Sequence, residues 1–325
     1  MSMFTEDDFQ HIWGIIGPQQ NRTKCPEWRA RNAFDKAKEI IEADIDGAFV
    51  ETGCWKGGIS ALFGYMCEKE GKGRKTWVFD SFEGMSEAIE EIDGWTAMTP
   101  EVQLRNFNLD DFNETCYNLM KLKQETFQVY PGWVDDTMPT GGEELGEIAV
   151  LRVDVDWYEP TKVVIEKLYP KLISGGYFIC DDYGYWAGAR KACDDYRIEH
   201  DIMDPVIQTL KGTSRMVGTE HWWQKSWTMI IYIDIDETIA QPSETRDYNE
   251  STPMESNIIK ANKLYDEGHT IVYWTARGTT TGIDWTDVTR SQLDSWGVKY
   301  HDLKLGKPQY DLFIDDKALN TNDWR

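Results

Sequence analysis

Short apolar runs that end in acidic residues alternate with helical repeats along most of this chain. Residues 148–153 (IAVLRV) run into Asp154, and residues 177–180 (YFIC) run into two aspartates. Such runs are typical of buried strands in a parallel sheet, whose carboxyl ends meet at one edge. Between them apolar residues recur at helical spacing, as they do over residues 29–43. The alternation predicts an α/β fold with a doubly wound, Rossmann-like sheet.

The pattern predicts the following elements in the first two thirds of the chain. Strands are expected over residues 48–50, 76–79, 127–130, 148–153, 177–180, 206–210 and 214–218. Helices are expected over residues 29–43, 58–70, 160–172 and 187–199. Thr99–Pro100 is expected to begin a further helix, since threonine caps helices and proline is tolerated in their first turn. Gly175–Gly176 is expected to form a turn.

The same pattern starts again near residue 228. Strands are expected over 229–233, 270–274 and 312–314, and helices over 253–266 and 286–296. A length of 325 residues fits two domains of ordinary size. We therefore predict one domain over residues 1–226 and a second over 227–325. The polar stretch 240–252 and the shorter stretch 277–286 leave little room for an inserted subdomain.

Charge and cysteine content narrow the choice of partners. The formal net charge is −23, which disfavours nucleic acid and anionic membrane surfaces as partners. The six cysteines form no CxxC pair and are expected to be reduced thiols of a cytoplasmic protein. Residues 1–10 are polar and acidic and do not resemble a signal peptide. A small-molecule substrate and a possible homo-oligomer remain the expected partners.

Acidic residues follow the predicted strands of the first domain and indicate its chemistry. An acid at the end of the second strand, Asp80, suits a ribose diol. Three others, Asp154, Asp181 and Asp182, suit one octahedral Mg²⁺ ion. The glycine-bearing turn over residues 51–58 would let the backbone approach a ligand closely. It lacks the GxGxxG and Walker patterns, so a dinucleotide or an NTP is not favoured.

Six stretches of the first domain resemble the macrocin O-methyltransferase (TylF/MycF-like) family. They are FVETGCWKGG, FDSFEGM, VYPGWVDDTMP, LRVDVDWYEPT, LYPKLISGGYFICDDYG and ARKACDDYR, and they occur in the family's order. The resemblance covers residues 23–223. It implies an S-adenosylmethionine-dependent, Mg²⁺-dependent enzyme that methylates sugar hydroxyls.

The same resemblance assigns residues to roles. It implies that S-adenosylmethionine is bound by Glu51, Thr52, Gly53, Asp80, Ser81, Asp135 and Asp136. It implies that Asp154, Asp181 and Asp182 bind the metal, with Asp154 also acting as the base. Metal coordination lowers the pKa of a hydroxyl, which would otherwise be a poor nucleophile.

In the second domain, Asp234 and Asp236 follow the first strand and point the same way. Such a pair can hold a cation and leave one carboxylate free to attack phosphorus. The stretches DIDET, YWTAR, GKP and FIDDKA resemble the haloacid dehalogenase (HAD) phosphatase superfamily over residues 229–323. The resemblance implies a capless HAD-like domain that holds its own Mg²⁺ ion.

The HAD resemblance also assigns roles. It makes Asp234 the nucleophile, Asp236 the acid/base and Thr275 a phosphate ligand. Lys307 is preferred as the phosphate-binding lysine over Lys304. Asp234, Asp236, Asp315 and Asp316 are the expected Mg²⁺ ligands.

The sequence thus predicts a bifunctional sugar O-methyltransferase and phosphatase in glycan or glycosylated-metabolite biosynthesis. Two alternatives stay open. The HAD-like domain could serve only for docking or regulation, or it could act on nucleic-acid ends, which the acidic charge disfavours.

Overall fold

The computed structural model describes residues 2–94, 107–209, 220–226, 229–310 and 318–324. The chain divides into two compact units, Met1–Lys225 and Ser226–Arg325. No helix within these described residues is long and apolar enough to span a membrane. The six cysteines all lie in the first unit, and each is buried and unpaired.

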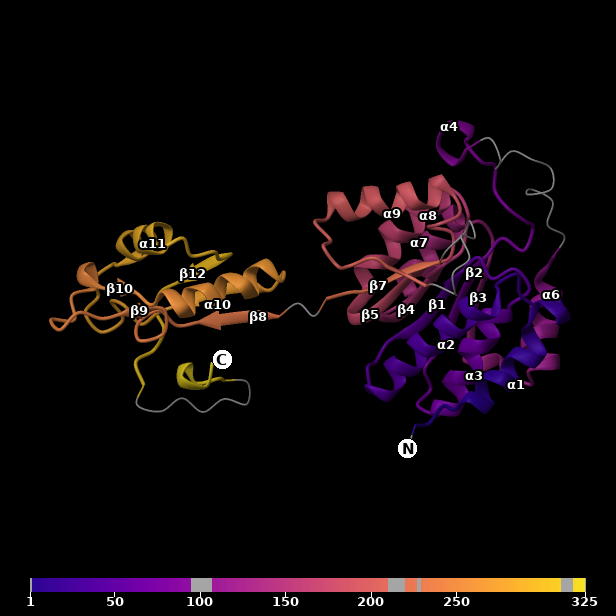
Figure 1. Ribbon diagram of the computed structural model, residues 1–325, viewed down its shortest axis with the longest axis horizontal. Helices are drawn as coiled ribbons and strands as arrows, with labels where there is room; N and C mark the ends of the chain where they lie inside the picture. Colours follow the sequence, from indigo (N-terminus) through magenta and orange to yellow (C-terminus); the bar gives the residue numbers. More distant parts are fainter. Residues whose placement is uncertain (1, 95–106, 210–219, 227–228, 311–317, 325) are drawn as a thin grey trace. The chain divides into compact units, whose positions relative to one another are not determined.

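In the described part of the first unit, seven strands form one sheet in the order β3-β2-β1-β4-β5-β7-β6 (Figure 1). Strands β1 to β5 run parallel, β7 is antiparallel to β5, and β6 is antiparallel to β7. Their bounds are β1 (Ala48–Thr52), β2 (Thr76–Asp80), β3 (Phe127–Pro131), β4 (Ile148–Val153), β5 (Leu172–Cys180), β6 (Ile207–Gln208) and β7 (His221–Gln224).

This strand order fixes where a ligand can bind. From β1 the chain continues to β2 and β3 on one side, and β4 and β5 lie on the other. The carboxyl ends of β1 and β4 therefore form the topological switch point, where open α/β sheets bind ligands. Every residue of β4 is buried, as its apolar sequence predicts.

Helices cover both faces of this sheet. Figure 1 shows α1, α2 and α3 on one face and α7, α8 and α9 on the other, and two separate buried cores lie beneath them. The helices are α1 (Glu6–Ile16), α2 (Glu27–Glu42), α3 (Gly58–Glu70), α4 (Glu90–Asp93), α6 (Leu109–Asn113), α7 (Val134–Glu144), α8 (Tyr158–Leu168) and α9 (Ala187–Glu199). Shorter turns are η1 (Pro18–Gln20), η4 (Gln124–Thr126), η5 (Tyr169–Lys171) and the π-helical η3 (Glu114–Leu119).

The second unit has a smaller parallel sheet, with the order β12-β11-β8 in its described residues. Its strands are β8 (Ile230–Ile233), β11 (Thr270–Trp274) and β12 (Asp302–Lys304), and β9 (Ala240–Gln241) pairs with β10 (Thr252–Pro253). Its helices are α10 (Glu255–Asp266) and α11 (Thr286–Ser295), with short turns η6 (Tyr248–Glu250) and η7 (Thr321–Asp323). A core that includes Ile235, Ile271 and Leu293 holds these elements together.

Most predicted elements are confirmed, and the differences have local causes. The predicted turn at Gly175–Gly176 is wrong, because both residues lie inside β5. A Cβ on Gly176 would lie 2.9 Å from the backbone oxygen of Ala149, so close strand packing requires glycine there. Helix α8 ends before its predicted end because Pro170 cannot continue it.

Other elements were missed or fall outside the described residues. The sequence pattern did not reveal α1, α7 or the short β12. The helix start predicted at Thr99–Pro100 and the strands predicted over 214–218 and 312–314 lie outside the described residues.

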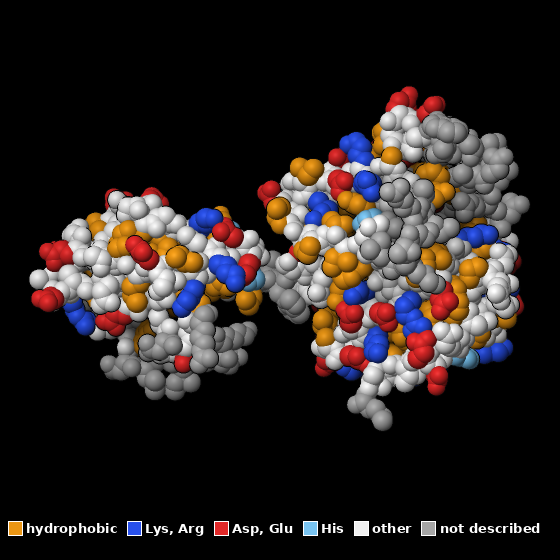
Figure 2. Space-filling model, viewed as in Figure 1, with side chains coloured by type: hydrophobic (Ala, Val, Ile, Leu, Met, Phe, Trp, Pro, Cys, Tyr) orange, Lys and Arg blue, Asp and Glu red, His pale blue; other side chains and the backbone are white. Residues whose placement is uncertain are grey.

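Basic and acidic side chains are interspersed on the face drawn in Figure 2.

Candidate functional site

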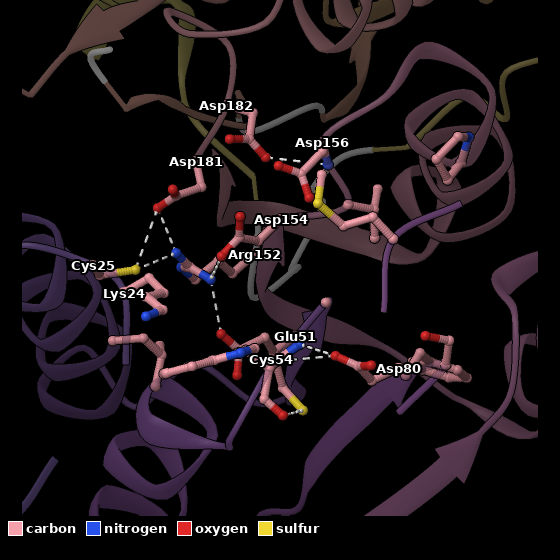
Figure 3. Close-up of a pocket in the computed structure, with 18 of the residues that line it drawn as sticks. Lys24, Cys25, Glu51, Cys54, Asp80, Arg152, Asp154, Asp156, Asp181 and Asp182 are labelled. Carbon is pink, nitrogen blue, oxygen red and sulfur yellow. Dashed lines mark hydrogen bonds and ion pairs between the residues drawn. The ribbon is translucent and has the colours of Figure 1, made fainter. Parts of the chain in front are cut away.

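A pocket of about 450 Å³ opens at the switch point of the first unit (Figure 3). Four strand ends contribute acids to its wall: Glu51 from β1, Asp80 from β2, Asp154 after β4, and Asp181 with Asp182 after β5. The convergence follows from the parallel sheet, because the carboxyl ends of its strands share one edge.

Asp80 holds the turn that follows β1. Its Oδ2 accepts the backbone N–H groups of Cys54 at 2.6 Å and Trp55 at 2.9 Å, and its Oδ1 accepts that of Phe82 at 2.8 Å. Burial raises the pKa of Asp80 and outweighs these three hydrogen bonds, which act in the opposite direction. The acid predicted to bind the cofactor therefore also shapes the loop around it.

Gly53 lets this turn lie directly against the end of β4. Its φ is +77°, a region that favours glycine. A Cβ at this position would lie only 1.8 Å from the backbone oxygen of Asp154. The turn after β1 and the end of β4 are therefore in contact through backbone atoms at Gly53 and Asp154.

Arg152 links the acids of the pocket. Its Nη1 donates to Glu51 Oε1 at 2.8 Å and to Asp154 Oδ2 at 2.9 Å. Its Nη2 donates to Asp181 and lies 3.0 Å from the Sγ of Cys25. The side chains of Arg152 and Glu51 are each 1% exposed, whereas that of Asp154, which lines the pocket, is 26% exposed, so the network is buried except where Asp154 meets the pocket. Figure 3 shows the guanidinium between the acids of β1, β4 and β5.

Arg152 is not among the site residues predicted from the sequence, although the sequence contains a signal for it. An arginine in the apolar run IAVLRV is unusual for a buried strand, and its side chain points the same way as that of Asp154, two residues on. A buried cation in such a run needs acidic partners, and the neighbouring strand ends carry them.

This network sets different proton affinities for its acids. Burial works to raise the pKa of Asp181, but Arg152 and Arg29 outweigh it and hold that pKa below its usual value. Burial and then the Asp181 carboxylate raise the pKa of Asp154. Burial and the neighbouring Asp156 raise the pKa of Asp182 well above its usual range. Burial also raises the pKa of Glu51 to about 7.

The donor set fits a divalent cation in part. Ligand atoms of Asp154, Asp181 and Cys25 lie within 4.8 Å of one another. Asp182 lines the same pocket and accepts the backbone N–H of Asp156 at 3.2 Å. Carboxylate oxygens are what Mg²⁺ prefers, and a nearby cation would favour the charged forms of Asp154 and Asp182. Cys25, which was not predicted as a site residue, adds a soft sulfur to this group of hard oxygen ligands.

The remaining predicted cofactor residues are placed differently. Ser81 lines the pocket, and its hydroxyl donates to the backbone oxygen of Gly84 at 2.8 Å. Thr52 is buried inside β1 and does not line the pocket. Asp135 and Asp136 are exposed in the first turn of α7 and do not line it either, whereas the preceding Trp133 does.

Aromatic side chains form much of the remaining wall. Trp55, Trp133, Tyr185 and Trp186 all line the pocket. Trp186 donates its indole N–H to Asp156 Oδ1 at 3.0 Å, and Trp55 lies 4.5 Å below the Nζ of Lys24. Such a wall suits a ligand with apolar faces and polar edges.

The second unit brings together four of its predicted site residues. Asp234, at the end of β8, accepts from Lys307 Nζ at 2.6 Å. Lys304 is placed elsewhere, with its Nζ 3.1 Å from the Tyr232 hydroxyl. Thr275 Oγ1 lies 3.5 Å from Asp236 Oδ2. The predicted metal ligands Asp315 and Asp316 lie outside the described residues.

Arg277 is a second buried cation that was not predicted as a site residue. Its Nε and Nη2 donate to Asp236 at 3.0 Å and 2.7 Å, while its Nη1 donates to Thr289 and Gln292 of α11. The guanidinium is fully buried, and Asp236 is its ion-pair partner. Arg277 follows Thr275 by two residues in the stretch YWTAR, and this position was the signal in the sequence that it belongs to the site.

The comparison with known protein families gives a match within the first unit. The family described as Macrocin-O-methyltransferase (TylF) matches residues 6–215, well over half of the chain. The chain belongs to this family. The resemblance predicted for the first domain is thereby confirmed, and this unit is an O-methyltransferase domain.

Curated relatives and one solved structure agree with the family. Demethyldecarbamoylnovobiocin O-methyltransferase of Streptomyces niveus is 34% identical over 192 residues, which are 55% of this chain and 69% of that protein. Mycinamicin III 3''-O-methyltransferase of Micromonospora griseorubida is 30% identical over 237 residues, covering 64% of this chain and 89% of that protein. The structure of the O-methyltransferase NovP superposes with a TM-score of 0.57 at 30% identity, covering 64% of this chain and 84% of NovP.

The family match ends before the second unit begins. The likeness of that unit to HAD phosphatases therefore stays a prediction.

Proposed function

We propose that the first unit transfers the methyl group of S-adenosylmethionine to a hydroxyl of a sugar. The convergence of two acid groups in one pocket carries this proposal. Glu51 and Asp80 lie on the β1–β2 side, and Asp154 and Asp181 on the β4–β5 side. A cofactor on one side and an acceptor on the other would meet at the switch point.

The chain's own residues then have distinct tasks. Asp80 holds the turn over the cofactor, and the aromatic wall excludes water from the reacting atoms. Asp154 takes the proton of the acceptor hydroxyl as that oxygen bonds to the methyl carbon and the carbon–sulfur bond breaks. Mg²⁺, held by Asp154, Asp181 and Asp182, would make the hydroxyl more acidic when bound.

Binding and turnover of the full-length protein test this function. Calorimetry with S-adenosylhomocysteine should show binding, and mass spectrometry should detect methylated products in a panel of sugars, glycosides and phosphosugars. Asp80→Ala should weaken binding by about 1–3 kcal/mol, because a buried charged partner is lost. Asp135→Ala is the matched control, since this exposed aspartate does not line the pocket. Absence of heat with wild type would overturn the proposal.

A second activity, phosphate monoester hydrolysis, is favoured by the paired side chains of the second unit. Asp234 lies 2.6 Å from Lys307 Nζ, and Asp236 is fixed by Arg277. In this proposal an Asp234 oxygen bonds to phosphorus, the bond to the leaving oxygen breaks, and Asp236 protonates that oxygen. Water then attacks phosphorus, Asp236 takes a proton from that water, and the bond between Asp234 and phosphorus breaks, which releases phosphate. Mg²⁺ would be held by Asp234 and Asp236 together with Asp315 and Asp316, and would offset the charge of the phosphoryl group.

Phosphate release from phosphosugars and from a general phosphatase substrate tests this activity. Asp234→Asn preserves the shape of the side chain and removes the nucleophile, so turnover should fall by several orders of magnitude. Asp302→Asn, an exposed change in β12, should leave turnover unchanged. Beryllium fluoride, which mimics an aspartyl phosphate, should bind wild type and not Asp234→Asn. A wild type without phosphatase activity would favour a docking role, and selective release from nucleic-acid ends would favour the other alternative.

A further inference from the structure

Lys24 lies on the wall of the methyltransferase pocket without a carboxylate partner in the described residues. Its ammonium is 4.5 Å from the centre of the Trp55 ring, and the residue is exposed. The next residue, Cys25, has its Sγ 3.7 Å from Asp181 Oδ1. Trp55 in turn donates its backbone N–H to Asp80. Lys24 therefore lies between two parts of the pocket. One is Cys25, which contacts Asp181 on the proposed acceptor side, and the other is the turn that Asp80 holds on the proposed cofactor side.

The other cations near this pocket already have acidic partners. Arg152 contacts Glu51, Asp154 and Asp181. Arg29 pairs with Asp181. Lys56, which also approaches the Trp55 ring, pairs with Asp111 at 3.1 Å. Among the described cations around the pocket, Lys24 is thus the one whose charge remains available to a ligand.

We propose that Lys24 selects a methyl acceptor that carries a phosphate group, a sugar phosphate or a nucleotide-activated sugar, over a neutral glycoside. This proposal rests on the proposed methyltransferase function. An ammonium binds phosphate as a compact point charge, and the Trp55 ring, 4.5 Å from Nζ, keeps the Lys24 ammonium at the pocket wall. The phosphatase activity proposed for the second unit would also require a phosphorylated compound, which agrees with this choice of acceptor.

A competing role for Lys24 is to bind the carboxylate of S-adenosylmethionine. The two roles differ in what they change. If Lys24 binds the acceptor, replacing it leaves the affinity for S-adenosylhomocysteine unaltered. If Lys24 binds the cofactor, replacing it weakens that affinity and lowers activity on every acceptor alike.

The test compares Lys24→Met with Lys56→Met in an Asp234→Asn background, which prevents hydrolysis of phosphorylated acceptors. Each sugar is offered as its 1-phosphate, its nucleoside diphosphate derivative and its methyl glycoside. Lys24→Met should lower kcat/KM for the phosphorylated forms by about 10- to 100-fold, as loss of a charge-assisted hydrogen bond does, and leave the glycoside unchanged. Lys56→Met should change neither, and Lys24→Arg should recover most of the preference. The 1-phosphate and the diphosphate arms separate the two sources of phosphate.

Three outcomes would overturn the proposal. They are equal use of glycoside and phosphorylated acceptor by wild type, an equal loss on both in Lys24→Met, and weaker S-adenosylhomocysteine binding in Lys24→Met. If no acceptor of any kind is methylated, the methyltransferase proposal fails by itself. Calorimetry with inorganic pyrophosphate then tests whether Lys24 binds phosphate. Pyrophosphate should bind to Lys56→Met and should not bind to Lys24→Met.

Discussion

The two units place their acidic residues in the same way, but the cations that pair with these acids come from different parts of each unit. In both, acids follow parallel strands and meet at one edge of a sheet. In the first unit the central cation, Arg152, lies within β4 itself and contacts acids from three strand ends. In the second unit two cations, Arg277 and Lys307, come from segments after β11 and β12, and each pairs with one acid.

This difference has a physical consequence. A cation fixed in a buried strand cannot leave, so the first unit keeps its acids in a permanent network. A lysine on a connecting segment can exchange its carboxylate partner for a phosphate group. Arg152 and its partners Glu51 and Asp181 are at most 5% exposed, whereas Lys307 is 11% and Asp234 34% exposed, so the ion pair of the second unit is the more accessible to a ligand.

Loss of Arg152 should have the largest effect on stability. Arg152→Met leaves Glu51, Asp154 and Asp181 without their shared cation, and breaking a buried ion pair costs about 3–5 kcal/mol. Hydrogen exchange of the β4 and β5 amides should report this loss, while β8 and β11 should be unaffected. Lys191→Met, which removes an exposed pair with Asp195, should change nothing measurable. Unchanged protection of β4 in Arg152→Met would show that the network does not stabilise the sheet.

Loss of Asp236 should have a somewhat smaller effect, confined to the second unit. Asp236→Ala leaves the buried Arg277 without its carboxylate and should cost on the order of 3 kcal/mol. Asp234→Ala is the comparison, because its partner Lys307 lies on a connecting segment and can reorient toward water. Hydrogen exchange of β11 and α11 should separate the two variants. Equal protection in both would contradict the distinction between fixed and exchangeable cations.

The smallest effect is the one expected between pH 7 and 8. Burial raises the pKa of Glu220, which accepts from Asn32 at 2.7 Å, to about 8. The folded state then holds a proton that the unfolded state releases near pH 4.5, so stability should fall as pH rises from about 4.5 to 8. Glu220→Gln should flatten that fall, most visibly between pH 7 and 8, above the pKa of Glu51. Glu199→Gln, an exposed change, should keep the wild-type profile in denaturant titrations.

The sequence predicted the acids better than the cations. Strand ends such as Asp154 and Asp234 follow apolar runs, so periodicity alone placed them at one edge of each sheet. Arg152 and Arg277 gain their roles from partners far along the chain, 101 residues away for Arg152 and Glu51 and 41 for Arg277 and Asp236. Such pairings depend on the order of strands in the sheet, which periodicity does not specify.

Loops and short elements were the other weak point. Cys25 lies in an irregular segment with no periodic pattern, and it reaches Asp181 only because α2 begins beside the strand ends. Strand β12 has three residues, too few to show an alternation. The glycines of β5 were misread because close packing and tight turns both favour glycine.

The contact between Gly53 and the backbone of Asp154 limits how this enzyme can be redesigned. Any larger residue at position 53 would separate β1 from β4 and disturb both halves of the pocket together. Libraries that seek new acceptors should therefore hold Gly53 constant and vary side chains that reach the wall from outside the sheet. Lys24 and Tyr185 are the most direct choices, since both are exposed and line the pocket from segments outside the strands of the sheet.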